Sequence, residues 1–132
     1  MKVDKDCRYT ENHEWVRVDG NEATVGITDY AQQELSDVVY VELPDIGDVF
    51  DKGDVFATVE SVKAAADVYM PIGGEIAEIN EELEDAPQLV NEDPFGAAWF
   101  ARFNASDLSE LDDLMDAETY EGFVAEEEAE GD

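Results

Sequence analysis

The chain has 132 residues, enough for one domain with its own core and little more. Asp and Glu number 36 against 7 Lys and Arg, so the formal net charge is −29. Such a surface lacks the basic clusters that bind nucleic acids or anionic membranes, and we expect neither as a partner. The single Cys7 and the single His13 exclude an internal disulfide and a Cys/His metal cluster, so no metal site is expected.

The surplus of carboxylates has two physical explanations, and the sequence leaves both open. An acidic surface keeps a protein hydrated and soluble in a salty cytoplasm, which favours a halophilic organism as the source. Partner enzymes with basic docking patches would favour the same composition. The first residues lack the apolar stretch of a signal peptide, and no segment has the length of a membrane span. We therefore expect a cytoplasmic protein.

The first half of the chain predicts short strands and one helix. Alternating residues in EWVRV and ATVGI, separated by DGNE, predict a hairpin. Thr28 or Asp29 can cap a short helix near residues 29–36, which should end at Ser36 and Asp37. The β-branched run VVYVEL, closed by Pro44, predicts a further strand.

The second half predicts more strands and then a helix. Two strands are predicted at DVYM and EIAEI, on either side of a turn at Pro71. The polar segment NEELEDAPQLVNEDPFG that follows predicts a long loop, and a further strand is predicted at AAWFARF. Short strands between frequent turns indicate a mainly β fold, a barrel or sandwich. Leucines at helical spacing predict a C-terminal helix over about 106–125, with Ser106 or Asp107 as its cap and Glu110 completing a capping box. We expect one domain over 1–125 and a disordered acidic tail over 126–132.

Lys63 is the most informative side chain because two strand-like segments, VFATVES and AADVY, flank it. A lysine at a hairpin tip is accessible to a modifying enzyme, and a cofactor linked to it can swing between active sites. The alternative is that Lys63 is an ordinary solvated charge. The chain has only four lysines, Lys2, Lys5, Lys52 and Lys63, and this scarcity favours the tether.

Several segments resemble the glycine cleavage H-protein family, over nearly all of the chain. The residues around Lys63 resemble the family's lipoyl attachment motif: Glu60, Ser61, Val62 and Ala64. Further segments that resemble the family are HEWV, GITDYAQ, VELP, PIGGE and NEDP. Two positions differ from the family pattern: Ser36 replaces a glycine after the first helix, and Ala98 replaces a glycine before Trp99. Both differences concern local turn geometry.

The resemblance implies a barrel-sandwich hybrid of the lipoyl and biotinyl carrier type, with lipoate attached to Lys63. It implies a non-catalytic subunit that carries the aminomethyl group of glycine from the decarboxylating glycine dehydrogenase, or P protein, to the aminomethyltransferase, or T protein. The L protein, dihydrolipoyl dehydrogenase, then reoxidises the dithiol, and a lipoate-attaching enzyme is a further expected partner. Because the loaded arm ends in a cationic amine, Glu14 and Asp67 are candidates to hold it, and His13 could help position it.

Other classes of protein fit less well. Biotin carriers flank their lysine with methionines, whereas Val62 and Ala64 stand here, and the lipoyl domains of 2-oxoacid dehydrogenases lack the HEWV and C-terminal helix segments. An independent enzyme would need a nucleophile with its base, a metal triad or a phosphate-binding loop, none of which these residues provide. An H-like protein that relays or stores lipoate for other complexes would have the same sequence features, and this alternative stays open.

Overall fold

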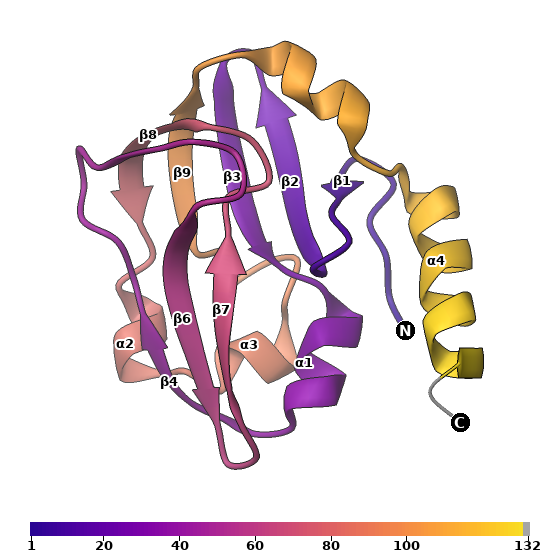
Figure 1. Cartoon of the computed structure of the whole chain (residues 1–132). Coiled ribbons are helices and arrows are strands. Elements are labelled where there is room, and N and C mark those ends of the chain that lie inside the picture. Colours follow the sequence, from indigo (N-terminus) through magenta and orange to yellow (C-terminus); the bar gives the residue numbers. More distant parts are fainter. Residues whose placement is uncertain (131–132) are drawn as a thin grey trace.

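The computed structural model describes residues 1–130, which form two antiparallel sheets with helices around them (Figure 1). The larger sheet has the order β1-β2-β3-β9-β8-β5 and the smaller one the order β4-β6-β7. The strands of the larger sheet are Arg8–Tyr9, Glu14–Asp19, Glu22–Ile27, Ala101–Ala105, Gly74–Ile79 and Val49–Phe50, in that spatial order. Those of the smaller sheet are Val38–Glu42, Val55–Ser61 and Ala65–Tyr69. The mainly β prediction is confirmed.

The predicted hairpin is the β2–β3 pair, in which Asp19 lies opposite Glu22 and Val16 opposite Val25. Gly20 has a φ of 66°, a value that glycine adopts without steric cost, and this allows the tight turn. Successive side chains of a strand point to opposite faces of the sheet. Val16 therefore joins the core between the sheets, while Trp15 faces the other side.

The main core lies between the two sheets and contains fully buried side chains from both, among them Val25, Val41, Val59, Ile76 and Phe103. A second cluster lies on the outer face of β2 and contains Cys7, Tyr9, Trp15, Tyr120 and Val124. This cluster attaches helix α4 (Ala117–Glu130) beside β1 (Figure 1). Cys7 is only 2% exposed, and burial raises the pKa of its thiol to about 12.

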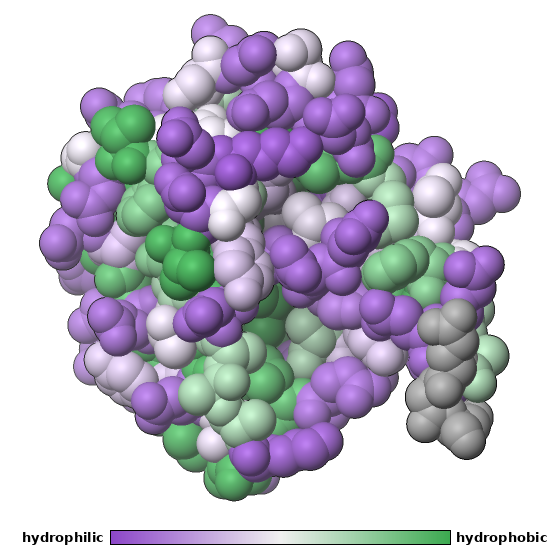
Figure 2. All heavy atoms as spheres, in the orientation of Figure 1, coloured by the Kyte–Doolittle hydropathy of each residue, from purple (hydrophilic) through white to green (hydrophobic). Residues whose placement is uncertain are grey.

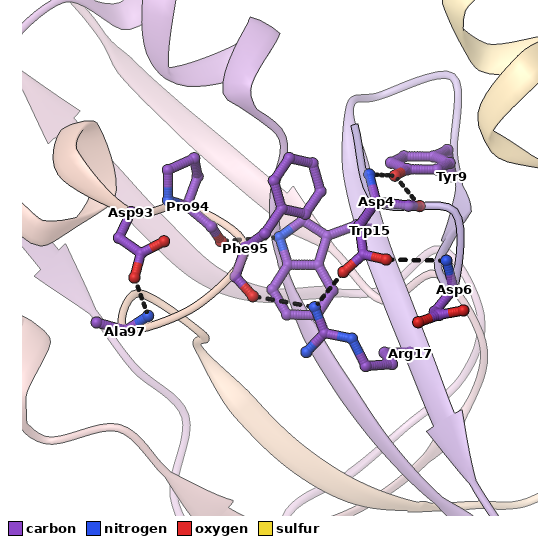
Figure 3. Close-up of polar contacts among 9 residues, drawn as sticks. All are labelled: Asp4, Asp6, Tyr9, Trp15, Arg17, Asp93, Pro94, Phe95 and Ala97. Carbon is purple, nitrogen blue, oxygen red and sulfur yellow. Dashed lines mark hydrogen bonds and ion pairs between the residues drawn. The ribbon is translucent and has the colours of Figure 1, made fainter. Parts of the chain in front are cut away.

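Polar contacts fix the outer face of β2 (Figure 3). The Trp15 indole N–H donates to the carbonyl of Pro94 at 3.0 Å. The Arg17 guanidinium lies over the Trp15 ring and donates both to Asp4 at 2.9 Å and to the carbonyl of Phe95 at 3.0 Å. These bonds join the N-terminal segment and the loop before β9 to β2, so the start of β2 is held on both sides.

Helix α1 (Asp29–Leu35) begins and ends where the sequence predicted. The Thr28 hydroxyl accepts a hydrogen bond from the backbone N–H of Ala31 and is the N-cap. The helix ends at Ser36, which has a φ of 65° and a ψ of −154°. This conformation is nearly restricted to glycine, so Ser36 is strained at the position where the family pattern has a glycine.

The prediction of a long loop between β8 and β9 was wrong in part, because this segment contains two short helices. They are α2 (Glu82–Asp85) and α3 (Leu89–Glu92). Each inserts one fully buried apolar side chain into the core, Leu83 and Val90 respectively. One apolar residue per turn in an otherwise polar segment gives no clear helical period, which explains the error.

The continuous helix predicted over 106–125 is divided in the structure. A 3-10 helix, η1 (Leu108–Asp113), comes first, with Asp107 as its cap, and α4 follows after an extended break. The break arises because Met115 exchanges two backbone hydrogen bonds with Tyr9, which require an extended chain. Glu110 does not complete a capping box, since its carboxylate accepts from the backbone N–H of Gly73 at 2.9 Å.

The acidic tail predicted to be disordered from residue 126 is helical as far as the structure describes it, because α4 continues to Glu130. Residues 131–132 lie outside the described residues. Within residues 1–130, no helix combines the length and the apolar character needed to cross a membrane.

Candidate functional site

Lys63 lies at the tip of the β6–β7 hairpin, as predicted (Figure 1). Ser61 ends β6 and closes the turn between the two strands, because its backbone N–H donates to the carbonyl of Ala64 at 2.8 Å. The Ser61 hydroxyl oxygen also accepts from the backbone N–H groups of Lys63 at 3.1 Å and Ala64 at 3.0 Å. One serine therefore holds the turn that presents Lys63.

The Lys63 side chain is exposed and lies against the end of helix α1. Its Nζ donates to the backbone carbonyl of Glu34 at 3.2 Å, and the described residues place no carboxylate within ion-pair distance of it. Lys52, by contrast, pairs with Asp113 at 3.1 Å. The backbone N–H of Val62 donates to the carbonyl of Asp37, which fastens the tip to the segment after α1.

The surface around the tip is partly apolar. Val62 is 69% exposed, and Figure 2 shows hydrophobic side chains at the lower end of this face, over the β6–β7 hairpin, within a mainly hydrophilic surface. Glu60, the first residue of the predicted motif, is exposed and lies opposite Ala65 in the hairpin.

A cleft of about 180 Å³ opens between α1 and the β6–β7 pair, next to Lys63. Most of its lining is apolar: Ile27, Tyr30, Ala31, Leu35, Val59 and Val68. Its polar lining includes all three residues that the sequence singled out for docking, Glu14, Asp67 and His13. Glu34 lines the cleft as well and contacts Lys63 through its carbonyl, so the tip and the cleft adjoin each other.

Glu14 is the buried carboxylate of this cleft, with 2% of its surface exposed. Its Oε1 accepts from the Thr10 hydroxyl at 2.5 Å and its Oε2 from the backbone N–H of Tyr69 at 3.2 Å, a bond that joins β2 to β7. Burial disfavours the charged form and raises the pKa of Glu14 to about 7. A cation that entered the cleft would favour ionisation of this carboxyl group.

Asp67 and His13 differ in how far they are already engaged. Asp67 is exposed on β7, opposite Thr58. Both ring nitrogens of His13 have partners on α4: Nδ1 lies 2.9 Å from the Tyr120 hydroxyl, and Nε2 lies 2.9 Å from a Glu127 carboxylate oxygen. His13 therefore connects the cleft to α4, whereas the Asp67 carboxylate has no ion-pair partner within residues 1–130 and lies at the edge of the cleft.

Two residues that contact the predicted site residues were absent from the sequence prediction. Glu34 lines the cleft and contacts Lys63 through its backbone, which leaves no signal in the side chain. Thr10 lies outside the cleft lining and contacts Glu14 from a non-strand segment. Among the aromatic residues, Trp15 is fully buried, Tyr30 is 9% exposed and lines the cleft, and Trp99 packs beneath the Arg102 guanidinium.

Comparison with known proteins agrees with this geometry. The family model for Glycine cleavage H-protein matches residues 7–127. The glycine cleavage system H protein of Halothermothrix orenii is 50% identical over 97% of this chain and 100% of its own length, and that of Vibrio campbellii is 53% identical over 95% and 100%. The crystal structure of a glycine cleavage system H protein from Mycobacterium marinum matches with a TM-score of 0.83 at 33% identity, over 91% of this chain and 97% of that one.

The structural match confirms the expected fold, a lipoyl-carrier-type barrel-sandwich with a C-terminal helix. The family match runs through both sheets, the Lys63 hairpin and most of α4. The chain therefore belongs to the glycine cleavage H-protein family, and it is a lipoate-carrying subunit of the glycine cleavage system and not itself a catalyst.

Proposed function

We propose that Lys63 is the residue that carries lipoate, through an amide at its Nζ. The arm would take the aminomethyl group of glycine from the P protein to the T protein and be reoxidised by the L protein, in the cytoplasm. The observation that carries this proposal is the position of Lys63: an exposed tip, no carboxylate partner among the described residues, and a cleft directly beside it.

The residues around Lys63 fit such a group. Amide formation removes the positive charge of a lysine, and Lys63 has no ion pair within the described chain to lose, whereas Lys52 has one. The apolar cleft lining, with Ile27, Ala31 and Leu35, suits an aliphatic chain and a ring of carbon and sulfur. When bound, lipoate supplies a disulfide that can accept the transferred group and a dithiol that can be reoxidised.

The chain's own carboxylates would hold the transferred amine. An ammonium group in the cleft would lie near Glu14, whose ionised form it stabilises, and near Asp67 at the edge. The apolar walls would exclude water from the labile bond to sulfur. His13 would orient this end of the cleft, since its ring lines the cleft and is fixed by α4.

The hairpin itself would be the recognition element for the lipoate-attaching enzyme. Ser61 sets the turn, and Glu60, Val62 and Ala64 surround Lys63 on an exposed surface. A rigid, protruding tip presents one amine in a reproducible orientation, which a modifying enzyme requires.

The test is the intact mass of the protein from its native host, followed by peptide sequencing of any modified segment. We expect the mass of one lipoyl group on Lys63, its loss in Lys63→Arg, and its retention in the control Lys52→Arg. An unmodified chain from cells that actively break down glycine, or the modification on another lysine, would overturn the assignment.

We also propose that the acidic surface is an adaptation to high salt. The net charge of −29 is offset by only three Lys or Arg ion pairs with carboxylates within the described residues, so most carboxylates repel one another without compensation. Since salt screens this repulsion, the melting temperature should rise by about 5 °C or more between low and molar KCl. A melting temperature that stays constant or falls would contradict the adaptation.

A further inference from the structure

Helix α4 reaches the cleft through a chain of hydrogen bonds centred on Tyr120. The Tyr120 hydroxyl lies 2.7 Å from the Thr28 hydroxyl and 2.9 Å from His13 Nδ1. On its other side the His13 ring meets Glu127, two helical turns after Tyr120. Tyr120 is fully buried and its ring stacks on Tyr9 at 4.5 Å, so the hydroxyl position is fixed by packing.

One arrangement of protons satisfies this whole chain of bonds. With its proton on Nε2, His13 donates to Glu127 and accepts at Nδ1 from Tyr120. Tyr120 in turn accepts from Thr28, whose oxygen accepts from the backbone N–H of Ala31. Each donor then has an acceptor, and for the neutral ring this network favours the tautomer with its proton on Nε2.

The network acts on both sides of the cleft. On the α1 side it includes Thr28, the N-cap of the helix that contributes Tyr30 and Ala31 to the lining. On the β2 side it includes His13, which has a φ of 68° and whose neighbours in the chain, Asn12 and Glu14, both line the cleft. A left-handed conformation is unfavourable for a residue with a side chain and persists only where surrounding contacts hold it.

The side-chain contacts of His13 come mainly from α4, whereas its backbone N–H donates to the carbonyl of Thr10 at 3.2 Å and its carbonyl accepts from the backbone N–H of Thr28 at 3.0 Å. Tyr120 and Glu127 bind its two ring nitrogens. The ring centroid of Phe123 lies 5.9 Å from that of His13, and the ring centroid of Tyr30, on α1, lies 4.7 Å from it. If the side-chain contacts with α4 were lost, the His13 ring would lose its fixed orientation and the adjacent start of β2 would be held by backbone hydrogen bonds alone. The Glu14 carboxylate would then move relative to the cleft.

We propose that α4 braces the cleft and that Tyr120 and Glu127 are positioning residues for the docked arm. Through Thr28 and His13 they hold the N-terminus of α1 and the start of β2, and so determine where Glu14 meets the transferred amine. This inference rests on the proposed docking of the Lys63 arm, and its tests separate the two.

The first test needs no lipoate. His13 is the only histidine, so ¹⁵N spectra of the imidazole in the full chain report it without ambiguity. We expect Tyr120→Phe, which keeps the buried ring, to shift the Nδ1 signal because Nδ1 loses its hydrogen-bond donor, and Glu127→Gln to shift the Nε2 signal. The matched controls Tyr40→Phe, on the exposed part of β4, and Glu126→Gln, on the exposed side of α4, should leave the spectrum unchanged.

The second test measures how long the lipoylated protein retains the aminomethyl group after loading by P protein and glycine. Tyr120→Phe should shorten the lifetime about fivefold, which corresponds to one ordinary hydrogen bond, and Glu127→Gln should shorten it to a similar extent. The two controls should match the wild type. Melting temperatures of all four variants identify any that fail to fold, and Glu127→Gln alters a partly exposed side chain that folding should tolerate.

The outcomes distinguish the two ideas. If the wild type protects the group no better than free lipoamide, arm docking itself fails. If the wild type protects the group and both α4 variants protect it equally well, docking stands and the bracing role of α4 is overturned. An unchanged imidazole spectrum in Tyr120→Phe would overturn it as well.

Discussion

The hairpin that presents Lys63 and the cleft beside it are constructed in opposite ways. The hairpin depends on contacts within a few residues, chiefly from Ser61 to Lys63 and Ala64. The cleft combines β2, α1 and the β6–β7 pair with α4, segments far apart in the sequence. The reactive amine is thus encoded locally and exposed, whereas the surface that would shelter its cargo depends on the whole fold.

The two regions differ in electrostatics as well. Lys63 is solvated and free of carboxylate partners in the described chain, while Glu14 is almost fully buried and its pKa is raised to about 7. An exposed amine can be modified without cost to folding. A buried carboxyl group, in contrast, affects stability in a way that depends on pH.

The largest expected effect concerns Glu14. Because its pKa is raised from 4.5 to about 7 on folding, the folded state binds more protons between these values. Its contribution to stability is therefore complete below about pH 4.5 and is lost as the pH rises through about 7, by on the order of 3 kcal/mol. Glu14→Gln, which stays neutral, should gain this amount relative to the wild type between pH 4.5 and pH 8 in urea denaturation.

The control for this prediction is Glu42→Gln, which alters an exposed carboxylate on β4. Its free energy of unfolding should follow the wild type across the same pH range. If Glu14→Gln also followed the wild type, Glu14 would not be a buried carboxyl group with a raised pKa, and the contrast between cleft and hairpin would weaken.

A smaller effect is expected at Gly26, directly before the cleft residue Ile27. A Cβ there would lie 2.7 Å from the Trp15 ring, which is fully buried and hydrogen-bonded to Pro94. Gly26→Ala should therefore lower the free energy of unfolding by about 1–3 kcal/mol. Gly122→Ala, in α4 with no atom within 4 Å of its Cβ, should instead raise stability by up to about 1 kcal/mol. Equal effects of the two substitutions in thermal unfolding would contradict this assignment.

The smallest effect is expected on the hairpin side, at the strained Ser36 near the segment that holds the tip. Ser36→Gly should raise the free energy of unfolding by about 1 kcal/mol, because glycine adopts a φ of 65° and a ψ of −154° without a steric penalty. The control is Ser106→Gly, at an exposed serine whose φ is not positive, and it should not raise the free energy of unfolding. A loss of stability in Ser36→Gly would show that the serine side chain contributes more than the strain costs.

What could be predicted from the sequence follows the same division. The β2–β3 hairpin, the Thr28 cap and the position of Lys63 depend on neighbouring residues, and all were predicted. Strand β1 exists because Tyr9 pairs with Trp15, and the chain breaks before α4 because Tyr9 also pairs with Met115. No local sequence pattern reveals these two contacts. The leucines of η1 also satisfy a 3-10 helix, so their spacing alone could not exclude a continuous α-helix.

Prediction of the cleft residues from sequence was limited in a similar way. Charge and the resemblance singled out Glu14, Asp67 and His13, and the structure brings all three to one cleft. Nothing in the acidic run of α4 distinguishes Glu127 from Glu126 or Glu128, and only the folded helix places Glu127 against His13. Long-range partners of this kind become visible only once the tertiary structure is known.

The burial of Cys7 has a consequence for redox chemistry. Thiol–disulfide exchange requires a thiolate that can reach the sulfur it attacks, and a thiol with a pKa of about 12 and 2% exposure provides neither. The fold thus carries a disulfide cofactor without a thiol of its own that could form a mixed disulfide with it. Thiol-reactive dyes applied to the native protein would consequently report the redox state of the cofactor alone.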